Sequence, residues 1–230
     1  MHFPLVFYGF YQNFFWLPAT GFLYSSPMLF ETNTIDKELR QKGYTLIAGV
    51  DEAGRGPLAG PVFAAAVILP PSNGLPETMD SKKLSPNRRE TLYDEILAVA
   101  VAWHVSSIES QVIDRVNILQ ATLKAMVLAV KNLSEIPEMI LVDGSHTPFV
   151  DSHSRALKKG DGISQSIGAA SVLAKVLRDR LMTRYHEEYP QYGFVRHKGY
   201  GTREHLDAIA EHGPCPIHRR SFAGVKEFVK

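Results

Sequence analysis

Cysteine is almost absent from this chain of 230 residues, which has only Cys215. One cysteine cannot form an internal disulfide, so the sequence excludes a disulfide-stapled domain and favours a reducing, cytoplasmic location. A zinc site is not supported either, because Cys215 and His218 supply two ligands where a structural site needs about four. We therefore interpret both residues as structural.

Net charge is also nearly absent. A value of +1 at pH 7 argues against a uniformly basic nucleic-acid binder. The charges are unevenly placed, because residues 155–222 hold twelve Lys/Arg against seven Asp/Glu. A hydrophobic content of 45% supports a packed core. We therefore expect a folded chain whose C-terminal part is more basic than the rest.

Charged side chains are missing from the first thirty residues, which contain eleven aromatic residues. A secretory signal would carry a basic region at its start. Pro4, Pro18 and Pro27 interrupt the apolar runs that a membrane span needs. We therefore expect an N-terminal extension with no membrane role, and Met28 is a candidate alternative start.

Two adjacent carboxylates end an apolar run, and a glycine turn follows in the sequence Ala48-Gly49-Val50-Asp51-Glu52-Ala53-Gly54-Arg55-Gly56-Pro57. Such a run indicates a buried strand, whose end lies at a sheet edge where sites are often built. Asp51 and Glu52 repel each other there unless a cation or a shared proton neutralises them. Oxygen ligands of this kind select Mg²⁺ or Mn²⁺. The acidic pair alone would favour a solvated turn. Together with the Gly-Arg-Gly turn and the acids further along the chain, it favours a metal site.

Two more aspartates share this context. Asp143 and Asp161 each follow an apparent strand, at residues 139–142 and 155–159, and each adjoins a glycine. Strand ends of one sheet converge in space, and a cluster of carboxylates is what two divalent ions require for phosphodiester hydrolysis. Whether Glu52 contributes its carboxylate or its backbone carbonyl stays open.

The remaining pattern alternates strands and helices. Strands are predicted at residues 45–50, 62–69 and 101–108, with a loop over residues 70–85. Ser85 and Pro86 predict the start of one helix, and Asn117 is the expected cap of another. A long helix is predicted from residue 167 to about residue 188.

Candidate phosphate contacts are basic or hydroxylated. Ser81 and Lys82 lie in the predicted loop, although surface lysines are usually just solvated. Ser171, Lys175 and Arg178 recur at the spacing of one helix face. Such groups suit phosphates, which position a nucleic acid without reading its sequence.

Three aromatic residues near the C-terminus are interpreted differently. Tyr192 and Phe194 are predicted to be core residues. Tyr200 has a glycine on each side, at Gly199 and Gly201, so we expect it to be exposed and to pack on a sugar or base.

From about residue 44 to residue 229 the chain resembles bacterial ribonuclease HII. Many segments match in the same order, which argues against chance. They are Asp51-Glu52-Ala53-Gly54-Arg55-Gly56-Pro57, Asp80-Ser81-Lys82-Lys83-Leu84, Asn117-Ile118-Leu119, Leu141-Val142-Asp143-Gly144, Lys159-Gly160-Asp161, Ala169-Ala170-Ser171-Val172-Leu173-Ala174-Lys175-Val176, His197-Lys198-Gly199-Tyr200 and His218-Arg219-Arg220-Ser221-Phe222. The sister family, ribonuclease HIII, typically has Lys in its glycine turn, where this chain has Arg55.

The resemblance implies an α/β, ribonuclease H-like fold, with a mixed sheet flanked by helices and a helical C-terminal region. Residues 41–230 would form the catalytic domain, and residues 1–40 an extension that is poorly ordered or outside it. The implied enzyme is an endonuclease that hydrolyses the RNA strand of RNA–DNA hybrids and cuts at single ribonucleotides in duplex DNA. Two Mn²⁺ or Mg²⁺ ions would assist, giving 5′-phosphate and 3′-hydroxyl ends during ribonucleotide and RNA primer removal. We expect a cytoplasmic monomer.

The resemblance also implies residue roles. The catalytic and metal-binding acids would be Asp51, Glu52, Asp143 and Asp161. The substrate would be bound by the 2′-OH-reading turn Gly54, Arg55 and Gly56, by Ser81, Lys82, Ser171 and Lys175, and by Tyr200, which would pack on the deoxyribose next to the ribonucleotide.

Two other classes remain as alternatives. A transposase or junction resolvase of the same fold would share the acids but has no reason to keep the Gly-Arg-Gly turn together with Tyr200. A catalytically dead nucleic-acid binder would be expected to have lost an acid, and all four are present.

Overall fold

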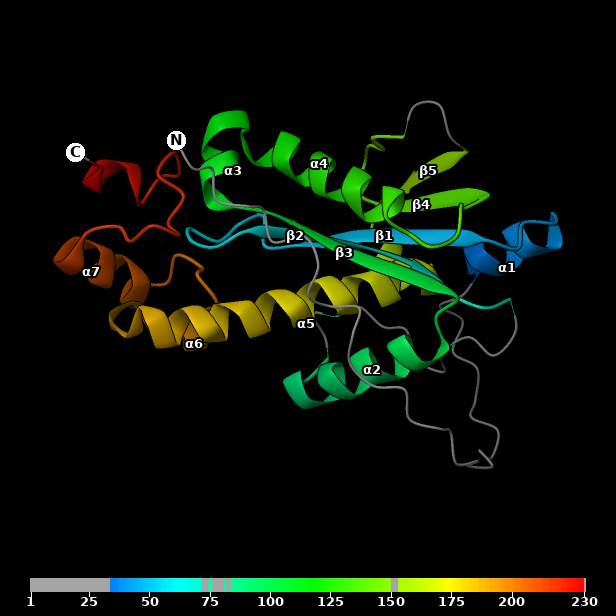
Figure 1. Ribbon diagram of the computed structural model, residues 1–230, viewed down its shortest axis with the longest axis horizontal. Coiled ribbons are helices and arrows are strands. Elements are labelled where there is room, and N and C mark those ends of the chain that lie inside the picture. The colour runs from blue at the N-terminus through cyan, green and yellow to red at the C-terminus, as the bar shows by residue number, and fades with distance from the viewer. Residues whose placement is uncertain (1–33, 72–74, 76–80, 82–83, 150–152, 230) are drawn as a thin grey trace, which may run out of the picture.

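One mixed sheet organises the structure, a computed structural model that describes residues 34–71, 75, 81, 84–149 and 153–229 (Figure 1). The strand order is β3-β2-β1-β4-β5. Strands β1 (Ile47–Ala53), β2 (Val62–Ile68) and β3 (Ala102–Ile108) are antiparallel neighbours. Strand β4 (Met139–Asp143) runs parallel to β1, and β5 (Ser154–Leu157) runs parallel to β4. The predicted α/β class with a mixed sheet is confirmed.

Helices cover both faces of the sheet (Figure 1). Helix α4 (Ile118–Lys131), preceded by α3 (Ser110–Val116), packs on one face, where Val50 and Ala64 meet Met126. Helices α2 (Pro86–Val99) and α5 (Gln165–Glu188) pack on the other face, where Val67 meets Leu173. Because side chains alternate along a strand, each strand supplies residues to both cores.

A glycine on β1 brings α5 directly onto the sheet. A Cβ atom placed on Gly49 would lie 2.0 Å from the backbone carbon of Ser166. Only a residue without a side chain permits this approach. Asp51 is two residues further along β1 and therefore lies on the same face, against α5.

The predicted helix starts are confirmed at two positions. The side chain of Ser85 accepts a hydrogen bond from the Arg88 N–H, and that of Asn117 accepts one from the Gln120 N–H. Several boundaries differ from the prediction. Strand β1 covers Ile47–Ala53 where residues 45–50 were predicted, so Asp51 and Glu52 lie within the strand and not after it. Helix α5 begins at Gln165 because Ser164 caps it, and β5 ends at Leu157 because the chain turns before η1 (Gly160–Gly162).

The C-terminal region is helical, as expected, with η2 (Pro190–Tyr192), α6 (Phe194–His197), α7 (Arg203–His212) and η3 (Lys226–Phe228). Tyr192 and Phe194 are buried there, which confirms their prediction as core residues. This region packs against the loop between β1 and β2, since the Leu58 N–H donates to the Gly199 carbonyl at 2.8 Å. The loop and the C-terminal region therefore meet at one end of the sheet (Figure 1).

Helix α1 (Thr34–Gln41) covers the last part of the expected extension. Its Ile35 and Leu39 pack in a core cluster with Ile47 and Leu141. The expected boundary at residue 40 therefore falls within a helix that packs on the sheet. Residues 1–33 lie outside the described part. Among the described residues, no helix is long and apolar enough to cross a membrane.

Candidate active site

Asp51 and Asp143 lie on neighbouring parallel strands, just past the last pair of residues that join these strands. Val50 of β1 pairs with Val142 of β4, so the two aspartates are the next residues on adjacent strands. Both lie on the face that α5 covers, by the alternation of side chains. Asp51 is buried there and accepts a hydrogen bond from the side chain of Ser171 on α5. The structure therefore brings together two acids that are far apart in the sequence.

The third aspartate is joined to this pair by the turn after β5. Lys159 adopts a left-handed backbone, with φ of 56°, and directs the chain into η1. The Gly160 N–H then donates to Asp143 Oδ1 at 2.7 Å. Asp161 follows and is buried. This hydrogen bond connects the end of β4, which carries Asp143, with η1, which carries Asp161.

Glu52 is placed differently from its neighbour. By alternation its side chain leaves β1 on the face opposite Asp51. Its carboxylate forms an ion pair with Arg55 at 3.3 Å, and the Arg55 side chain is half exposed. The alternative that Glu52 acts through its backbone carbonyl therefore stays open.

The acids destabilise one another as anions. Burial raises the pKa of Asp51 well above its ordinary value, and the charges of Glu52 and Asp143 raise it further. A divalent cation would relieve this repulsion, so the donor chemistry fits Mg²⁺ or Mn²⁺. Within the described residues, however, no group of three or more His, Cys, Asp or Glu side chains is already arranged to hold an ion.

The glycine turn lies beside Tyr200. Gly54 has a φ of +94°, and a Cβ atom there would collide with the guanidinium of Arg178. A Cβ atom on Gly56 would lie 3.5 Å from the ring of Tyr200. Tyr200 is 45% exposed, as the sequence predicted. The turn and the aromatic ring therefore form one continuous surface.

Arg178 does not have the phosphate-binding role that its helix spacing predicted. It is buried and donates to the carbonyl oxygens of Pro61, Ala59 and Lys198 at 3.0–3.1 Å. Helix spacing gave its face correctly, but the loop between β1 and β2 covers that part of α5. Arg178 therefore links this loop to the segment that carries Tyr200.

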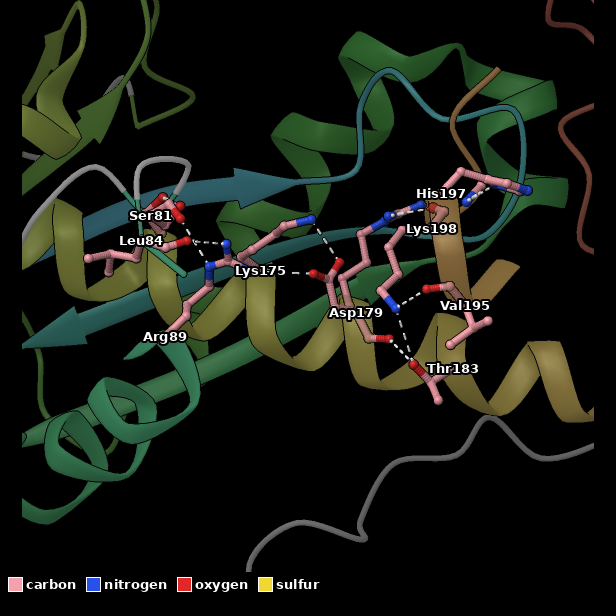
Figure 2. Close-up of polar contacts among 12 residues, drawn as sticks. Ser81, Leu84, Arg89, Lys175, Asp179, Thr183, Val195, His197 and Lys198 are labelled. Carbon is pink, nitrogen blue, oxygen red and sulfur yellow. Dashed lines mark hydrogen bonds and ion pairs between the residues drawn. The ribbon is translucent and has the colours of Figure 1, made fainter. Parts of the chain in front are cut away.

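Hydroxyl and basic groups continue along α5 (Figure 2). Ser81 and Ser171 are buried and share a hydrogen bond of 2.8 Å. Lys175 pairs with Asp179 at 2.8 Å, and Arg89 of α2 approaches the other oxygen of Asp179 at 3.6 Å. Lys82 lies outside the described residues.

Arg89 also fixes the segment before α2. Its guanidinium donates to the carbonyl oxygens of Ser81 and Leu84 at 3.0 and 2.9 Å. Asp179 therefore connects Lys175 with the segment that contains Ser81 (Figure 2).

The sequence patterns assigned no role to Arg219, Asp179 or His205. Arg219 is fully buried, and His205 is fully buried as well. Their partners are backbone carbonyls and side chains far away in the sequence, which no spacing rule reports. The motif His218-Arg219-Arg220-Ser221-Phe222 was the one available signal, and it covers only Arg219.

Comparison with known proteins supports the expected family. The family model described as Ribonuclease HII matches residues 48–225. A ribonuclease HII from Geotalea daltonii is 56% identical over 91% of this chain and 95% of its own length. One from Syntrophus aciditrophicus is 57% identical over 81% and 88%. The crystal structure of ribonuclease H2 from Pyrococcus horikoshii OT3 superposes with a TM-score of 0.68 and 26% identity, over 79% of this chain and 96% of that one.

The fold, the converging aspartates and the sequence matches therefore agree. This chain belongs to the ribonuclease HII family.

Proposed function

We propose that this protein is an endonuclease that hydrolyses the RNA strand of RNA–DNA hybrids and also cuts at single ribonucleotides in duplex DNA. The observation that carries the proposal is the convergence of Asp51 and Asp143 on neighbouring strands, with Asp161 next to Gly160, whose N–H donates to Asp143. Membership of a ribonuclease family supports the reaction class. The products would be 5′-phosphate and 3′-hydroxyl ends, as in ribonucleotide and RNA primer removal.

The four acids Asp51, Glu52, Asp143 and Asp161 would hold two Mg²⁺ or Mn²⁺ ions. Bound ions of this kind activate water and offset the charge that develops on the phosphate. The chain's own groups orient the ligands. Ser171 donates to Asp51, and the Gly160 N–H donates to Asp143 Oδ1, so each of these carboxylates is held by the chain itself. Glu52 would contribute either its carboxylate or its carbonyl oxygen.

The glycine turn would read the ribose 2′-OH, the group that distinguishes RNA from DNA. The backbone N–H groups of Arg55 and Gly56 donate no hydrogen bond within the described part of the chain. They are therefore available to a substrate oxygen. Gly54 and Gly56 allow a sugar to approach closely, and the half-exposed Arg55 side chain suits a phosphate.

Tyr200 would pack on the deoxyribose beside the ribonucleotide, because its exposed ring adjoins Gly56. The phosphate backbone would be contacted by Lys175 and Lys82. Ser81 and Ser171 are hydrogen-bonded to each other and buried, so their role would be to hold the Asp51 carboxylate in place. These contacts would position the duplex without reading its sequence.

The catalytic domain would comprise residues 41–230 with helix α1 packed on it, and it would act as a cytoplasmic monomer. Residues before α1 would be dispensable.

The test compares three substrates: a duplex with one ribonucleotide, an all-RNA strand hybridised to DNA, and plain duplex DNA. Cleavage of the first two with Mg²⁺ or Mn²⁺, and its loss with EDTA, is expected. Cutting of plain duplex DNA at a similar rate would instead favour the resolvase or transposase class. Binding of the hybrid without cleavage, with Mg²⁺ and with Mn²⁺, would favour the catalytically dead nucleic-acid binder.

A further inference from the structure

Three histidines are buried behind Tyr200. His205 and His218 are at most 1% exposed, and His197 stacks on His205 with ring centroids 4.5 Å apart. None of them belongs to the acidic site. They lie among the core residues Tyr192 and Phe194 of the C-terminal region.

The hydrogen bonds fix where the proton sits on each imidazole. His205 Nδ1 lies 2.9 Å from the Tyr200 carbonyl oxygen, which can only accept, so His205 Nδ1 carries the proton. His218 Nδ1 accepts from the Cys215 N–H at 2.9 Å, so the proton of neutral His218 is on Nε2. His218 Nε2 therefore donates to the bare His205 Nε2 at 3.0 Å.

The result is a directed chain of donors from Cys215 through His218 and His205 to the Tyr200 carbonyl. Burial lowers the pKa of His205 to about 4 and that of His218 to about 3, so both are neutral at pH 7. His218 thereby sets the tautomer of His205.

The backbone around Tyr200 needs this support. Lys198 and Gly199 both have left-handed backbones, with φ of 51° and 86°. The Gly199 N–H donates to His197 Nδ1 at 3.2 Å, and the Tyr200 N–H donates to the His197 carbonyl at 2.9 Å. The exposed ring of Tyr200 therefore extends from a backbone segment that is hydrogen-bonded to the buried residues His197 and His205.

We propose that His205, held in one tautomer by His218, is a positioning residue that fixes the Tyr200 backbone and so sets the ring against Gly56. The inference rests on the proposed contact of Tyr200 with the deoxyribose next to a ribonucleotide. If the Tyr200 ring were loosely held, the deoxyribose and the neighbouring scissile phosphate would be positioned less accurately. Small displacements of the reacting atoms lower the reaction rate steeply. His205 therefore controls how well a single ribonucleotide is cut.

Two substitutions separate this role from a general loss of stability. In His205→Asn, the amide nitrogen occupies the place of Nδ1 and keeps the donor to Tyr200. In His205→Gln, the amide occupies the place of Nε2, so the partner of His218 is kept and the donor to Tyr200 is lost. Tyr192→Phe is the control, because it removes the 2.7 Å hydrogen bond to the Gly213 carbonyl from the same core and leaves the hydrogen bonds of the donor chain in place.

The readout is the ratio of kcat for a single ribonucleotide to kcat for an all-RNA hybrid, with the melting temperature of each variant. We expect His205→Gln to lower this ratio about tenfold, as for loss of one buried hydrogen bond. His205→Asn should stay within about threefold of the unmodified protein. Tyr192→Phe should lower the melting temperature and leave the ratio unchanged. Equal ratios for the Asn and Gln variants would overturn the proposal.

Two further measurements separate this inference from the proposed function. The ¹⁵N spectrum of the imidazoles should show His205 protonated at Nδ1 and His218 at Nε2, and the opposite pattern would overturn the donor chain. Tyr200→Ala is assayed in parallel. An unchanged ratio in Tyr200→Ala refutes the proposed role of Tyr200, and with it the effect of His205 on cleavage.

Discussion

Arg219 donates from Nη1 to the carbonyl oxygen of Arg55 at 2.8 Å, although 164 positions separate the two residues. The same guanidinium donates to the carbonyls of Gly54 and Gly60. Three carbonyls of one loop are therefore held by one buried cation. Burial lowers the pKa of Arg219 to about 9, which still leaves it charged at pH 7.

This arrangement also polarises the turn. A cation bound to the carbonyl oxygens of Gly54 and Arg55 draws electrons through the two peptide groups. The N–H groups of Arg55 and Gly56 belong to those same peptide groups and become stronger donors. These are the two N–H groups that the proposed function assigns to the substrate.

Replacing Arg219 with Lys should therefore impair both the fold and the reaction. A Lys ammonium carries the charge but lacks the planar fork that reaches three carbonyls. We expect the free energy of unfolding to fall by about 2–3 kcal/mol and kcat on an all-RNA hybrid to fall at least tenfold. Denaturant titration and single-turnover assays measure the two effects. Arg220→Lys is the matched control, because within the described residues Arg220 makes its hydrogen bond through the backbone N–H, to Asp114, and not through its side chain. An active, stable Arg219→Lys enzyme would show that the carbonyl contacts do not matter.

Asp143→Asn should abolish cleavage while hybrid binding survives. The change is nearly isosteric and keeps an acceptor for the Gly160 N–H, but it removes a charge that offsets cations. Asp51→Asn and Asp161→Asn should behave alike. Cleavage assays at saturating Mn²⁺ and gel-shift titrations in EDTA check both parts. Near-normal turnover in any one variant would remove that residue from the site.

Asp179→Asn should strengthen binding to plain duplex DNA and make it more sensitive to salt. The substitution removes the negative charge that pairs with Lys175 and Arg89, and each additional phosphate contact makes the negative slope of log K against log salt steeper by about one. Glu90→Gln is the control, since it breaks another ion pair between α2 and α5, with Arg180, in a more exposed place. Binding isotherms at several salt concentrations give the slopes. Identical slopes for both variants would show that Asp179 does not control contacts between this protein and the duplex.

Stability should fall as the pH drops from about 6.5 toward 4. Burial lowers the pKa of His205 to about 4 and that of His218 to about 3 in the folded chain. Between these values and the ordinary pKa of about 6.5, the unfolded chain binds more protons than the folded chain, so acid favours unfolding. For His205 the loss at pH 4 is up to about 3 kcal/mol. Urea unfolding at pH 7.5, 6, 5 and 4 measures the decline. His205→Asn should show a shallower decline than the unmodified protein, and parallel curves would contradict the assignment.

Deleting residues 1–27 should leave cleavage of an all-RNA hybrid within a few-fold of the full chain. The deletion ends before α1, whose Ile35, Asp36 and Leu39 contact the core. A deletion to residue 41 should instead destabilise the protein, because it removes those contacts. Melting temperatures and rates of both truncations test this. Loss of activity in a folded truncation that lacks residues 1–27 would show that the extension takes part in the reaction.

The sequence by itself determined the local features of this protein. Ser85 and Asn117 mark helix starts because a cap depends only on neighbouring N–H groups. Asp51, Asp143 and Asp161 were recognisable because each follows an apparent strand and lies near a glycine. The motif order gave the family, and with it the mixed sheet.

Tertiary structure alone decided what the polar residues of the C-terminal half do. Helix spacing placed Ser171, Lys175 and Arg178 on one face, but only the fold shows that Arg178 lies under a loop while Lys175 pairs with Asp179. The proton positions on His205 and His218 likewise depend on carbonyl and N–H groups brought together from other segments. Burial and hydrogen-bond partners are properties of the packed chain, so the same residue types are solvated or structural according to what covers them.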